Sequence, residues 1–381
     1  MQRSNFKLVP IFSHSIVVDK PLIFPLYSHE GILLANKGSK LEDTQSLNLL
    51  KHGKIYTLES ELMKSLESLR VGSFELDSDK NKPYRFPHVL ERIVKLEKTF
   101  IDLLKTDAED FKHEFLMIVN NLESIVNDNH NGAVAKIFLH TNRYPALEYI
   151  FTFGILICVM VNHLNWKQKE KNRIILASLS HIVSIFSQTN TQAEHFKQFD
   201  EKYNISAINK ESVNFLRKRG IQDKKSLSYI SNLDFPDKID QQNKNDELTF
   251  AFSLFNFISQ FSSLVTGFNH PQWYYPTHAY KMLEKYCKNR YRNYFLTTLV
   301  SLIGRYPAGS IVKLQNGEVA IVIHQTNDLN HPMVKILLSN KGFSSRQMPE
   351  RQTNDGNHQI TSIMFSTQII DKIDFSRLWR N

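Results

Sequence analysis

The sequence is poor in cysteine, and its charge-free apolar runs are short. Cys158 and Cys287 are the only cysteines in 381 residues, which argues against a disulfide framework and a cysteine-based metal site. The longest apolar run without a charge covers residues 149–161, whereas a transmembrane helix needs about 20 residues. We interpret this run as a buried core helix. Because the first residues also lack the pattern of a secretory signal, we expect a cytoplasmic protein with no membrane partner.

Several well-known catalytic motifs are missing as well. The sequence has neither the G-x-x-x-x-G-K-[ST] loop nor the G-x-G-x-x-G turn, both of which cradle nucleotide phosphates. It also lacks the G-x-S-x-G nucleophile elbow and the H-E-x-x-H zinc motif. The 15 histidines are scattered along the chain instead of clustered. These absences leave no support for the hydrolase and nucleotide-binding classes that use these motifs.

The charge balance is basic but dispersed. The formal net charge is +9, which would suit an anionic partner. The basic residues fall into three separate clusters, at 167–173, 217–225 and 281–292. We interpret each cluster as the solvated face of a helix, so nucleic acid is an unfavoured partner. In the last cluster tyrosines alternate with lysines and arginines, and we expect the tyrosines to face the core while the cations extend into solvent.

The spacing of apolar residues changes from strand-like to helical along the chain. Residues 22–27 and 32–36 are predicted strands, and 41–52 is a predicted helix. From residue 88 onward the apolar residues recur at helical spacing. The expected helices cover 88–104, 111–126, 132–140, 145–163, 169–187, 209–218, 248–266 and 277–304. The segment after residue 310 is rich in strand-forming residues.

The most informative pattern lies at residues 301–323, where the end of a helix is followed by a hairpin. Pro307 and Gly309 end the apolar helix, and Asn316-Gly317 joins two runs rich in β-branched residues. This combination, YPAGSIVKLQNGE, resembles the end of HD-GYP domains. Those domains hydrolyse the bacterial messenger cyclic di-GMP at a site with two or three metal ions. The resemblance therefore implies where metal ligands are expected in this chain.

The resemblance also implies a fold and its division into domains. We expect a mainly α protein: an HD-domain-like helical bundle, preceded by a small N-terminal α/β unit and followed by a β-rich C-terminal tail. The expected parts are the N-terminal unit at 1–70, a linker at 71–87, a degenerate HD-GYP-like helical domain at 88–305 and a β-rich C-terminal extension at 306–381.

HD domains bind their metals through histidine and aspartate side chains that converge from separate helices. In HD-GYP domains the first ligand follows a tyrosine by four residues, and here Tyr144 is followed at that spacing by Glu148. The signature His-Asp pair corresponds to Ser180 and His181, so serine replaces the histidine and histidine replaces the aspartate. Glu148 and His181 also have structural interpretations, as a carboxylate near a helix N-terminus and as a core histidine.

The remaining ligand positions have also lost their ligands. Ser259 stands where the last metal-binding aspartate is expected, and Ser262 where a second aspartate is usual. The segment that should carry His-His-Glu and Gly-Tyr-Pro reads NLDFP at 232–236. Two neighbouring divalent ions need matching negative charge, which Glu148 and His181 do not supply. The sequence therefore predicts no catalytic residue, no metal and no other cofactor.

We accordingly favour a catalytically inactive HD-GYP-like protein that acts through a protein partner in bacterial signalling related to cyclic di-GMP. The former metal pocket would be lined by Tyr144, Glu148, Ser180, His181, Ser259 and Ser262. We expect Ser259 to face Ser180 and His181 from a neighbouring helix. A carboxylate left in such a cavity needs a donor, so we also expect a hydrogen bond between Glu148 and His181.

Two alternatives remain open from the sequence. The first is an active cyclic di-GMP phosphodiesterase whose substitute metal ligands are Glu148, His181, Asp234 and Asp237. The second is a module that binds cyclic di-GMP or nucleic acid without cleaving it. Its candidate phosphate-binding residues are Arg143, Arg290 and Arg292, because arginine presents a bidentate fork to phosphate.

Overall fold

The computed structural model describes residues 8–11, 22, 25–28, 30–39, 55–58, 88–106, 108–139, 145–188, 204–233, 246–270, 272–287, 290–345, 347–364, 367–370 and 373–379. Its contacts divide the chain into two compact units: residues 1–85 with 191–198, and residues 86–190 with 199–381. The predicted helical segment and the β-rich tail thus belong to one unit. The predicted linker at 71–87 and the predicted helix at 41–52 lie outside the described residues.

The first unit contains a small antiparallel sheet with the strand order β1-β4-β2-β3. The strands are β1 (Leu8–Ile11), β2 (Leu26–Tyr27), β3 (Leu33–Ala35) and β4 (Ile55–Leu58). Strands β2 and β3 are joined by a turn in which the Ser28 N–H donates to the Ile32 carbonyl and the Gly31 N–H donates to the Ser28 carbonyl. The two predicted strands are therefore confirmed, in a shorter form.

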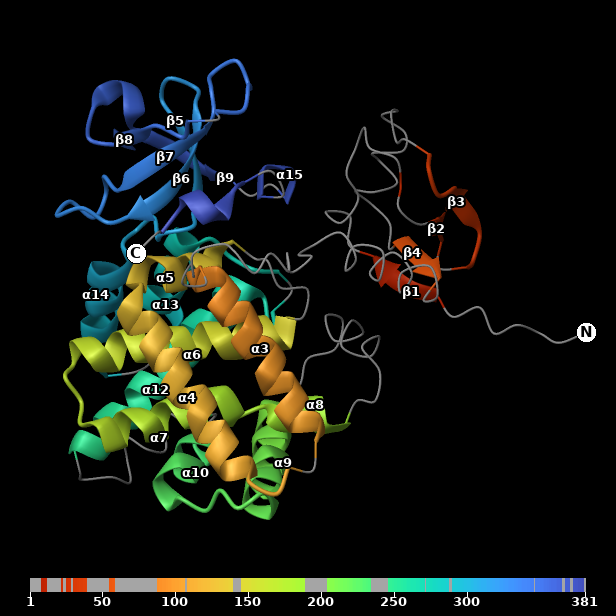
Figure 1. Cartoon of the computed structure of the whole chain (residues 1–381), viewed down its shortest axis with the longest axis vertical. Helices are drawn as coiled ribbons and strands as arrows, with labels where there is room; N and C mark the ends of the chain where they lie inside the picture. Colours follow the sequence, from red (N-terminus) through yellow and green to blue (C-terminus); the bar gives the residue numbers. More distant parts are fainter. Residues whose placement is uncertain are drawn as a thin grey trace, which may run out of the picture. The chain divides into compact units, whose positions relative to one another are not determined.

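The second unit is mainly helical. Its helices are α3 (Val89–Lys105), α4 (Phe111–Asp128), α5 (His130–Phe138), α6 (Pro145–His163), α7 (Gln168–Ser180), α8 (Val183–Gln188), α9 (Ile205–Lys218), α10 (Lys224–Ser231), α12 (Asp246–Thr266), α13 (Pro276–Tyr286), α14 (Arg292–Ile303) and α15 (Thr367–Ile370). Figure 1 shows these helices in order along the chain. The predicted fold class, mainly α with a small N-terminal unit and a β-rich C-terminal part, is confirmed.

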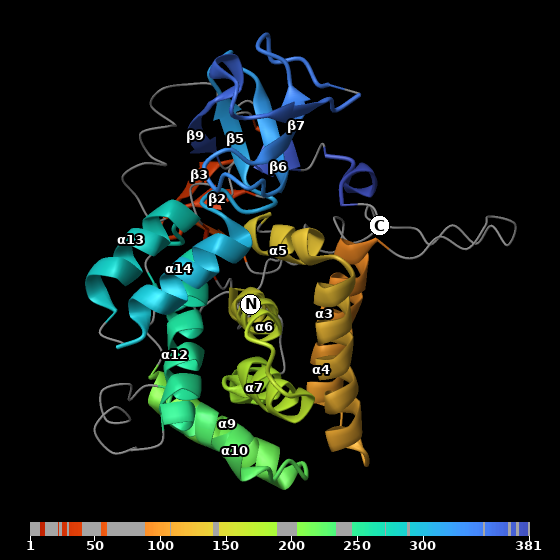
Figure 2. The same cartoon turned by 90° about the vertical axis from the view of Figure 1, so that its left-hand side faces the viewer.

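Helix α6 is the central helix of this unit. Figure 2 shows it between α12 on one side and the α3–α4 pair on the other, with α7 beside it. A Cβ atom on Gly154 would lie 2.9 Å from Leu122 and 2.9 Å from Leu179, so glycine allows α6 to approach α4 and α7 closely. Helices α6 and α12 are apolar and long enough to span a membrane, but both are mostly buried inside the protein. The predicted core helix is thus confirmed for α6.

Two predicted helices are each divided in the structure. The predicted helix 169–187 is interrupted after α7, where the His181 ring bonds to the carbonyl of Ser178 and α8 starts at Val183. The predicted helix 277–304 is interrupted between α13 and α14, where Cys287 is extended and its carbonyl accepts from Arg292. Apolar spacing did not detect these breaks, because the apolar residues continue on both sides of each one. Helix α10, which Asp223 caps, was not predicted.

The C-terminal part forms a five-stranded antiparallel sheet with the order β8-β7-β6-β5-β9. The strands are β5 (Ile311–Leu314), β6 (Val319–His324), β7 (Met333–Leu338), β8 (Glu350–Gln352) and β9 (Ile360–Met364), with short 3-10 helices η3 (Gly356–His358) and η4 (Phe375–Arg377). The predicted β5–β6 hairpin is confirmed. Gly317, with φ +86, donates its N–H to the Leu314 carbonyl at the turn.

The sheet is tied to the helices by specific contacts. Gly309 has φ +89, and a Cβ there would lie 2.5 Å from the carbonyl oxygen of Ala135 in α5. The Trp379 indole donates to the Ile323 carbonyl in β6 at 2.8 Å, while the Trp379 carbonyl accepts from Asn129 Nδ2 at 2.7 Å. Asn129 also caps α5 through its side-chain oxygen. Trp379 therefore links β6 to the start of α5.

Candidate functional site

His181 lies in the turn between α7 and α8 and is fully buried. Its Nδ1 is 2.9 Å from the carbonyl oxygen of Ser178. Because a carbonyl can only accept, Nδ1 carries the proton of the neutral ring. The other nitrogen, Nε2, is 3.1 Å from the hydroxyl of Tyr149 and therefore accepts from it.

Tyr149 connects this turn to a third helix. It is buried in α6, and its hydroxyl oxygen is 2.7 Å from Oγ of Ser259 in α12. The single hydroxyl proton of Tyr149 is donated to His181, so Ser259 must donate to Tyr149. The result is a directional chain from Ser259 through Tyr149 to His181 and then to the Ser178 carbonyl. We call this the Ser259–Tyr149–His181 chain.

The chain is surrounded by aromatic rings. Three rings meet the His181 imidazole edge-on, with centroid distances of 5.2 Å for Tyr149, 5.2 Å for Phe153 and 6.5 Å for Phe255. Tyr149 in turn stacks on Phe268 at 4.5 Å. Burial among these rings lowers the pKa of His181 to about 3, because desolvation disfavours the imidazolium. The histidine is therefore neutral at physiological pH.

The other two serines at the predicted ligand positions use their hydroxyls within their own helices. Ser180 Oγ donates to the Leu176 carbonyl at 2.6 Å, and Ser262 Oγ donates to the Ile258 carbonyl at 2.8 Å. Such bonds to the carbonyl four residues earlier are a common way for serine to satisfy its hydroxyl inside a helix. Of the three serines predicted to surround the site, Ser259 is the one that hydrogen-bonds toward His181.

Glu148 immediately precedes Tyr149 in α6 and is also buried. The predicted hydrogen bond between Glu148 and His181 is wrong, because Ser178 and Tyr149 occupy both ring nitrogens. The residue that the sequence reasoning missed is Tyr149. A buried tyrosine usually finds a hydrogen-bond partner for its hydroxyl. That requirement was the available signal for placing Tyr149 in the site.

The remaining predicted residues divide into two groups. Tyr144, Arg143, Asp234 and Asp237 lie outside the described residues. Arg290 and Arg292 lie at the corner between α13 and α14. The Arg292 guanidinium donates to the Cys287 carbonyl at 3.0 Å and to Asn293 Oδ1 at 3.2 Å, while Arg290 lies over the Tyr291 ring at 4.5 Å.

The donor set does not fit a cluster of divalent ions. Among the described residues, no group of three or more histidine, cysteine, aspartate or glutamate side chains is placed to hold a metal ion. Hard divalent cations require several oxygen or imidazole ligands at roughly 2.0–2.6 Å. Here His181 uses both nitrogens in hydrogen bonds, and Ser180 and Ser262 bond to backbone carbonyls. Glu148 is the single carboxylate among the described residues at the predicted ligand positions.

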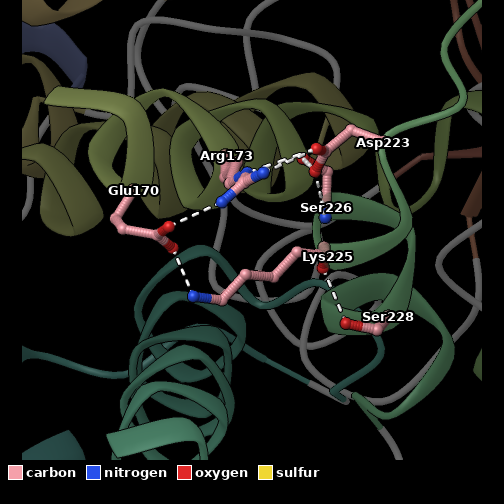
Figure 3. A network of polar contacts seen from close by, with 6 residues as sticks. All are labelled: Glu170, Arg173, Asp223, Lys225, Ser226 and Ser228. Atoms are coloured by element: carbon pink, nitrogen blue, oxygen red, sulfur yellow. Dashed lines mark hydrogen bonds and ion pairs between the residues drawn. The ribbon is translucent and has the colours of Figure 1, made fainter.

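A second polar group lies nearer the surface, between α7 and α10 (Figure 3). Arg173 binds Glu170 at 2.6 Å and Asp223 at 3.0 Å, and Lys225 binds the other oxygen of Glu170 at 2.6 Å. Asp223 caps α10, because its side chain also accepts from the N–H and the hydroxyl of Ser226. Partial burial opposes ionisation of Asp223, but the bonds from Ser226 and Arg173 outweigh it and lower its pKa. This network attaches α10 to α7.

A shallow hollow of about 490 Å³ lies beside this network. It is lined by Arg217, Gln222, Lys224, Leu227, Ser228, Ser231 and Asn232. Its lining includes two cations and several neutral polar groups. None of these residues belongs to the Ser259–Tyr149–His181 chain, so the hollow and the chain are separate features.

Comparison with known proteins gives little further information. No family model matches the sequence, and no curated protein matches it. A solved structure that is similar is that of Bd1817, a HDG"Y"P protein from Bdellovibrio bacteriovorus. The match has a TM-score of 0.41 and 14% sequence identity, and it covers 77% of this chain and 99% of that chain. A similarity of this strength assigns no role to any residue of this chain.

Proposed function

We propose that this protein is a catalytically inactive HD-GYP-like protein that acts by binding a partner in cytoplasmic signalling related to cyclic di-GMP. The helix-end and hairpin motif ending at Ile323 supports the HD-GYP-like part of the proposal. The substituted ligand positions support the loss of catalysis. The favoured partner is a protein, and cyclic di-GMP is a candidate ligand.

The hydrogen bond from Tyr149 to His181 Nε2 carries the proposal. A metal ion binds the lone pair of a neutral imidazole nitrogen, and here the Tyr149 hydroxyl uses that lone pair. Binding a metal at Nε2 would break this bond and leave a buried tyrosine hydroxyl without its acceptor, at a cost of about 1–3 kcal/mol. It would also place a double positive charge among aromatic rings, which costs far more.

The same geometry disfavours acid–base catalysis by His181 itself. A general base works best when its pKa lies near the working pH, and burial lowers the pKa of His181 to about 3. The side chain is also fully buried, so a substrate would have to displace the surrounding aromatic rings to reach it. Neither metal-assisted nor direct proton-transfer chemistry is supported at this position.

The proposal is tested by metal analysis and a hydrolysis assay on the purified full chain. We expect less than stoichiometric iron or manganese after purification, and no linear product when the protein is incubated with cyclic di-GMP and Mn²⁺. A second protein carries Glu148→His, Ser180→His, His181→Asp and Ser259→Asp. It should gain metal affinity but little turnover. Stoichiometric metal together with hydrolysis by the natural chain would overturn the proposal.

A further inference from the structure

Two tyrosines at the corner between α13 and α14 are exposed to solvent. Tyr286 is 64% exposed and Tyr294 is 49% exposed, whereas Tyr280 is buried. The prediction that the tyrosines of this segment face the core is therefore correct for Tyr280 and wrong for Tyr286 and Tyr294. Core packing explains the first ring, but it does not explain why two large aromatic rings stay in water.

The described residues on both sides of the corner make contacts with neighbouring elements. The Arg292 guanidinium donates to the Cys287 carbonyl at 3.0 Å, which connects the end of α13 to the start of α14. The ring of Phe250 in α12 lies 5.0 Å from Tyr291 and 5.9 Å from Tyr294. Figure 2 shows α13 and α14 along the outer edge of the helical part, beside α12. The exposed ring of Tyr294 thus packs partly against α12.

Basic side chains accompany the exposed rings. Lys285 Nζ lies 4.9 Å from the ring centre of Tyr286, and the Arg290 guanidinium lies 4.5 Å from that of Tyr291. Lys281 is also exposed, one turn before Lys285 on α13. Within the described residues of 281–294, Glu284 is the single acidic residue. We call Lys281, Lys285, Tyr286, Arg290, Tyr291 and Tyr294 the basic–aromatic corner.

We propose that the basic–aromatic corner binds single-stranded nucleic acid. Unpaired bases would stack on the exposed rings of Tyr286 and Tyr294, and the phosphates between them would contact Lys281, Lys285 and Arg290. Alternating aromatic and basic groups on one surface are typical of single-strand binding. The net charge of +9 would favour encounter with a polyanion. This activity goes beyond the proposed function and does not depend on it.

An acidic protein partner is the main competing explanation, and it would contact a different set of side chains. Acidic side chains would pair with Lys285 and Arg290 without using the flat faces of Tyr286 and Tyr294. Nucleobases use both, because each base has an aromatic face next to a phosphate. The tyrosine rings therefore distinguish the two partners, and the experiment removes rings and cations separately.

The test measures fluorescence anisotropy of labelled oligothymidylate and oligouridylate, each of about 20 nucleotides, with the full chain at low salt. We expect binding that weakens as salt rises. The double variant Tyr286→Ala and Tyr294→Ala should weaken binding about tenfold or more, while Tyr→Phe at both positions should preserve it. The double variant Lys285→Ala and Arg290→Ala should weaken binding and also reduce its salt dependence.

Two controls isolate the surface. Phe343 is 71% exposed in the loop after β7, and Phe343→Ala should leave binding unchanged. Heparin offers charge without bases, so the tyrosine-to-alanine variant should bind heparin as the natural chain does. Circular dichroism checks that each variant is folded. Absence of binding to both oligonucleotides at low salt would overturn the proposal, as would full affinity in the tyrosine-to-alanine variant.

Discussion

The hydroxyl of Tyr149 donates to Nε2 of His181 across 3.1 Å, and this bond connects α6 to the turn after α7. Ser259 in α12 donates to the same hydroxyl, so the residues at two predicted ligand positions meet through a tyrosine. A site of this kind is satisfied by hydrogen bonds alone. It needs no ion to neutralise charge, because the imidazole is neutral and its two partners are uncharged.

The Ser259–Tyr149–His181 chain should contribute to stability. Tyr149→Phe removes the donor to His181 Nε2 and leaves that buried nitrogen without a partner, so we expect a loss of about 1–3 kcal/mol in the free energy of unfolding. Ser259 can recover part of this loss by donating to a backbone carbonyl in its own helix. Urea denaturation measures the difference. Tyr294→Phe, at a half-exposed ring, is the matched control and should have almost no effect. Equal stability of the natural chain and Tyr149→Phe would contradict the hydrogen-bond chain.

Burial of His181 should make stability depend on pH. Its pKa is about 3 in the folded protein, against about 6.5 in an unfolded chain. Between these values the unfolded state binds a proton that the folded state does not. His181 therefore contributes its full stabilisation above about pH 6.5, and this stabilisation falls by up to about 1.4 kcal/mol per pH unit as the pH is lowered toward 3.

The comparison for this pH effect is His181→Gln, which removes the titrating group. The pKa of His130 is also lowered by burial, but its contribution is common to both proteins and cancels in the difference. When the pH is lowered from 7 to 5, the free energy of unfolding should fall more for the natural chain than for His181→Gln. Parallel pH profiles would show that His181 is not buried in its neutral form.

Lys136 and Glu97 form a buried ion pair between α5 and α3. Their charged atoms are 2.9 Å apart, and their side chains are 4% and 8% exposed. Lys136→Met alone leaves a buried carboxylate without its cation and should cost about 3–5 kcal/mol. The double variant Lys136→Met and Glu97→Leu should be more stable than Lys136→Met alone, because no unpaired charge remains. A double-mutant cycle measured by denaturation tests this, and additive single effects would contradict it.

Gly309 and Gly342 provide a matched pair for testing the join between the helices and the C-terminal sheet. Both have positive φ, +89 and +79, but a Cβ on Gly309 would lie 2.5 Å from the Ala135 carbonyl oxygen, while a Cβ on Gly342 would meet nothing within 4 Å. Gly342→Ala should therefore cost about 1 kcal/mol of backbone strain, and Gly309→Ala substantially more. Similar melting temperatures for the two variants would show that α5 is not in close contact with the segment around Gly309, between α14 and β5.

Much of the fold could be predicted from the sequence, because its helices carry regular apolar spacing. The apolar run at 149–161 correctly indicated a buried helix, and Asn316-Gly317 correctly placed the β5–β6 hairpin. The break between α13 and α14 was missed, although Cys287 is extended there and its carbonyl accepts from the Arg292 side chain. Apolar spacing records which face of a helix is buried, and it does not record such side-chain contacts with the backbone.

The candidate site was predictable only in part, for a similar reason. Ser259 and His181 share Tyr149 as a hydrogen-bond partner, which agrees with the expectation that they face each other from neighbouring elements. The need of a buried carboxylate for a donor suggested Glu148 as the partner of His181, whereas the structure uses the next residue, Tyr149. Successive residues on a helix point about 100° apart, so an error of one position selects a different face. Periodicity did not resolve this choice, because nearly every side chain of α6 is buried.

The protonation of His181 tests the central claim most directly. Two-dimensional NMR of ¹⁵N-histidine-labelled protein reports which ring nitrogen carries the proton. We expect a neutral ring with the proton on Nδ1 and a hydrogen-bonded Nε2, unchanged by one equivalent of Zn²⁺ at neutral pH. A proton on Nε2, or a shift of the Nε2 signal at stoichiometric Zn²⁺, would contradict the account, because it would show that Tyr149 does not hold the lone pair a metal requires.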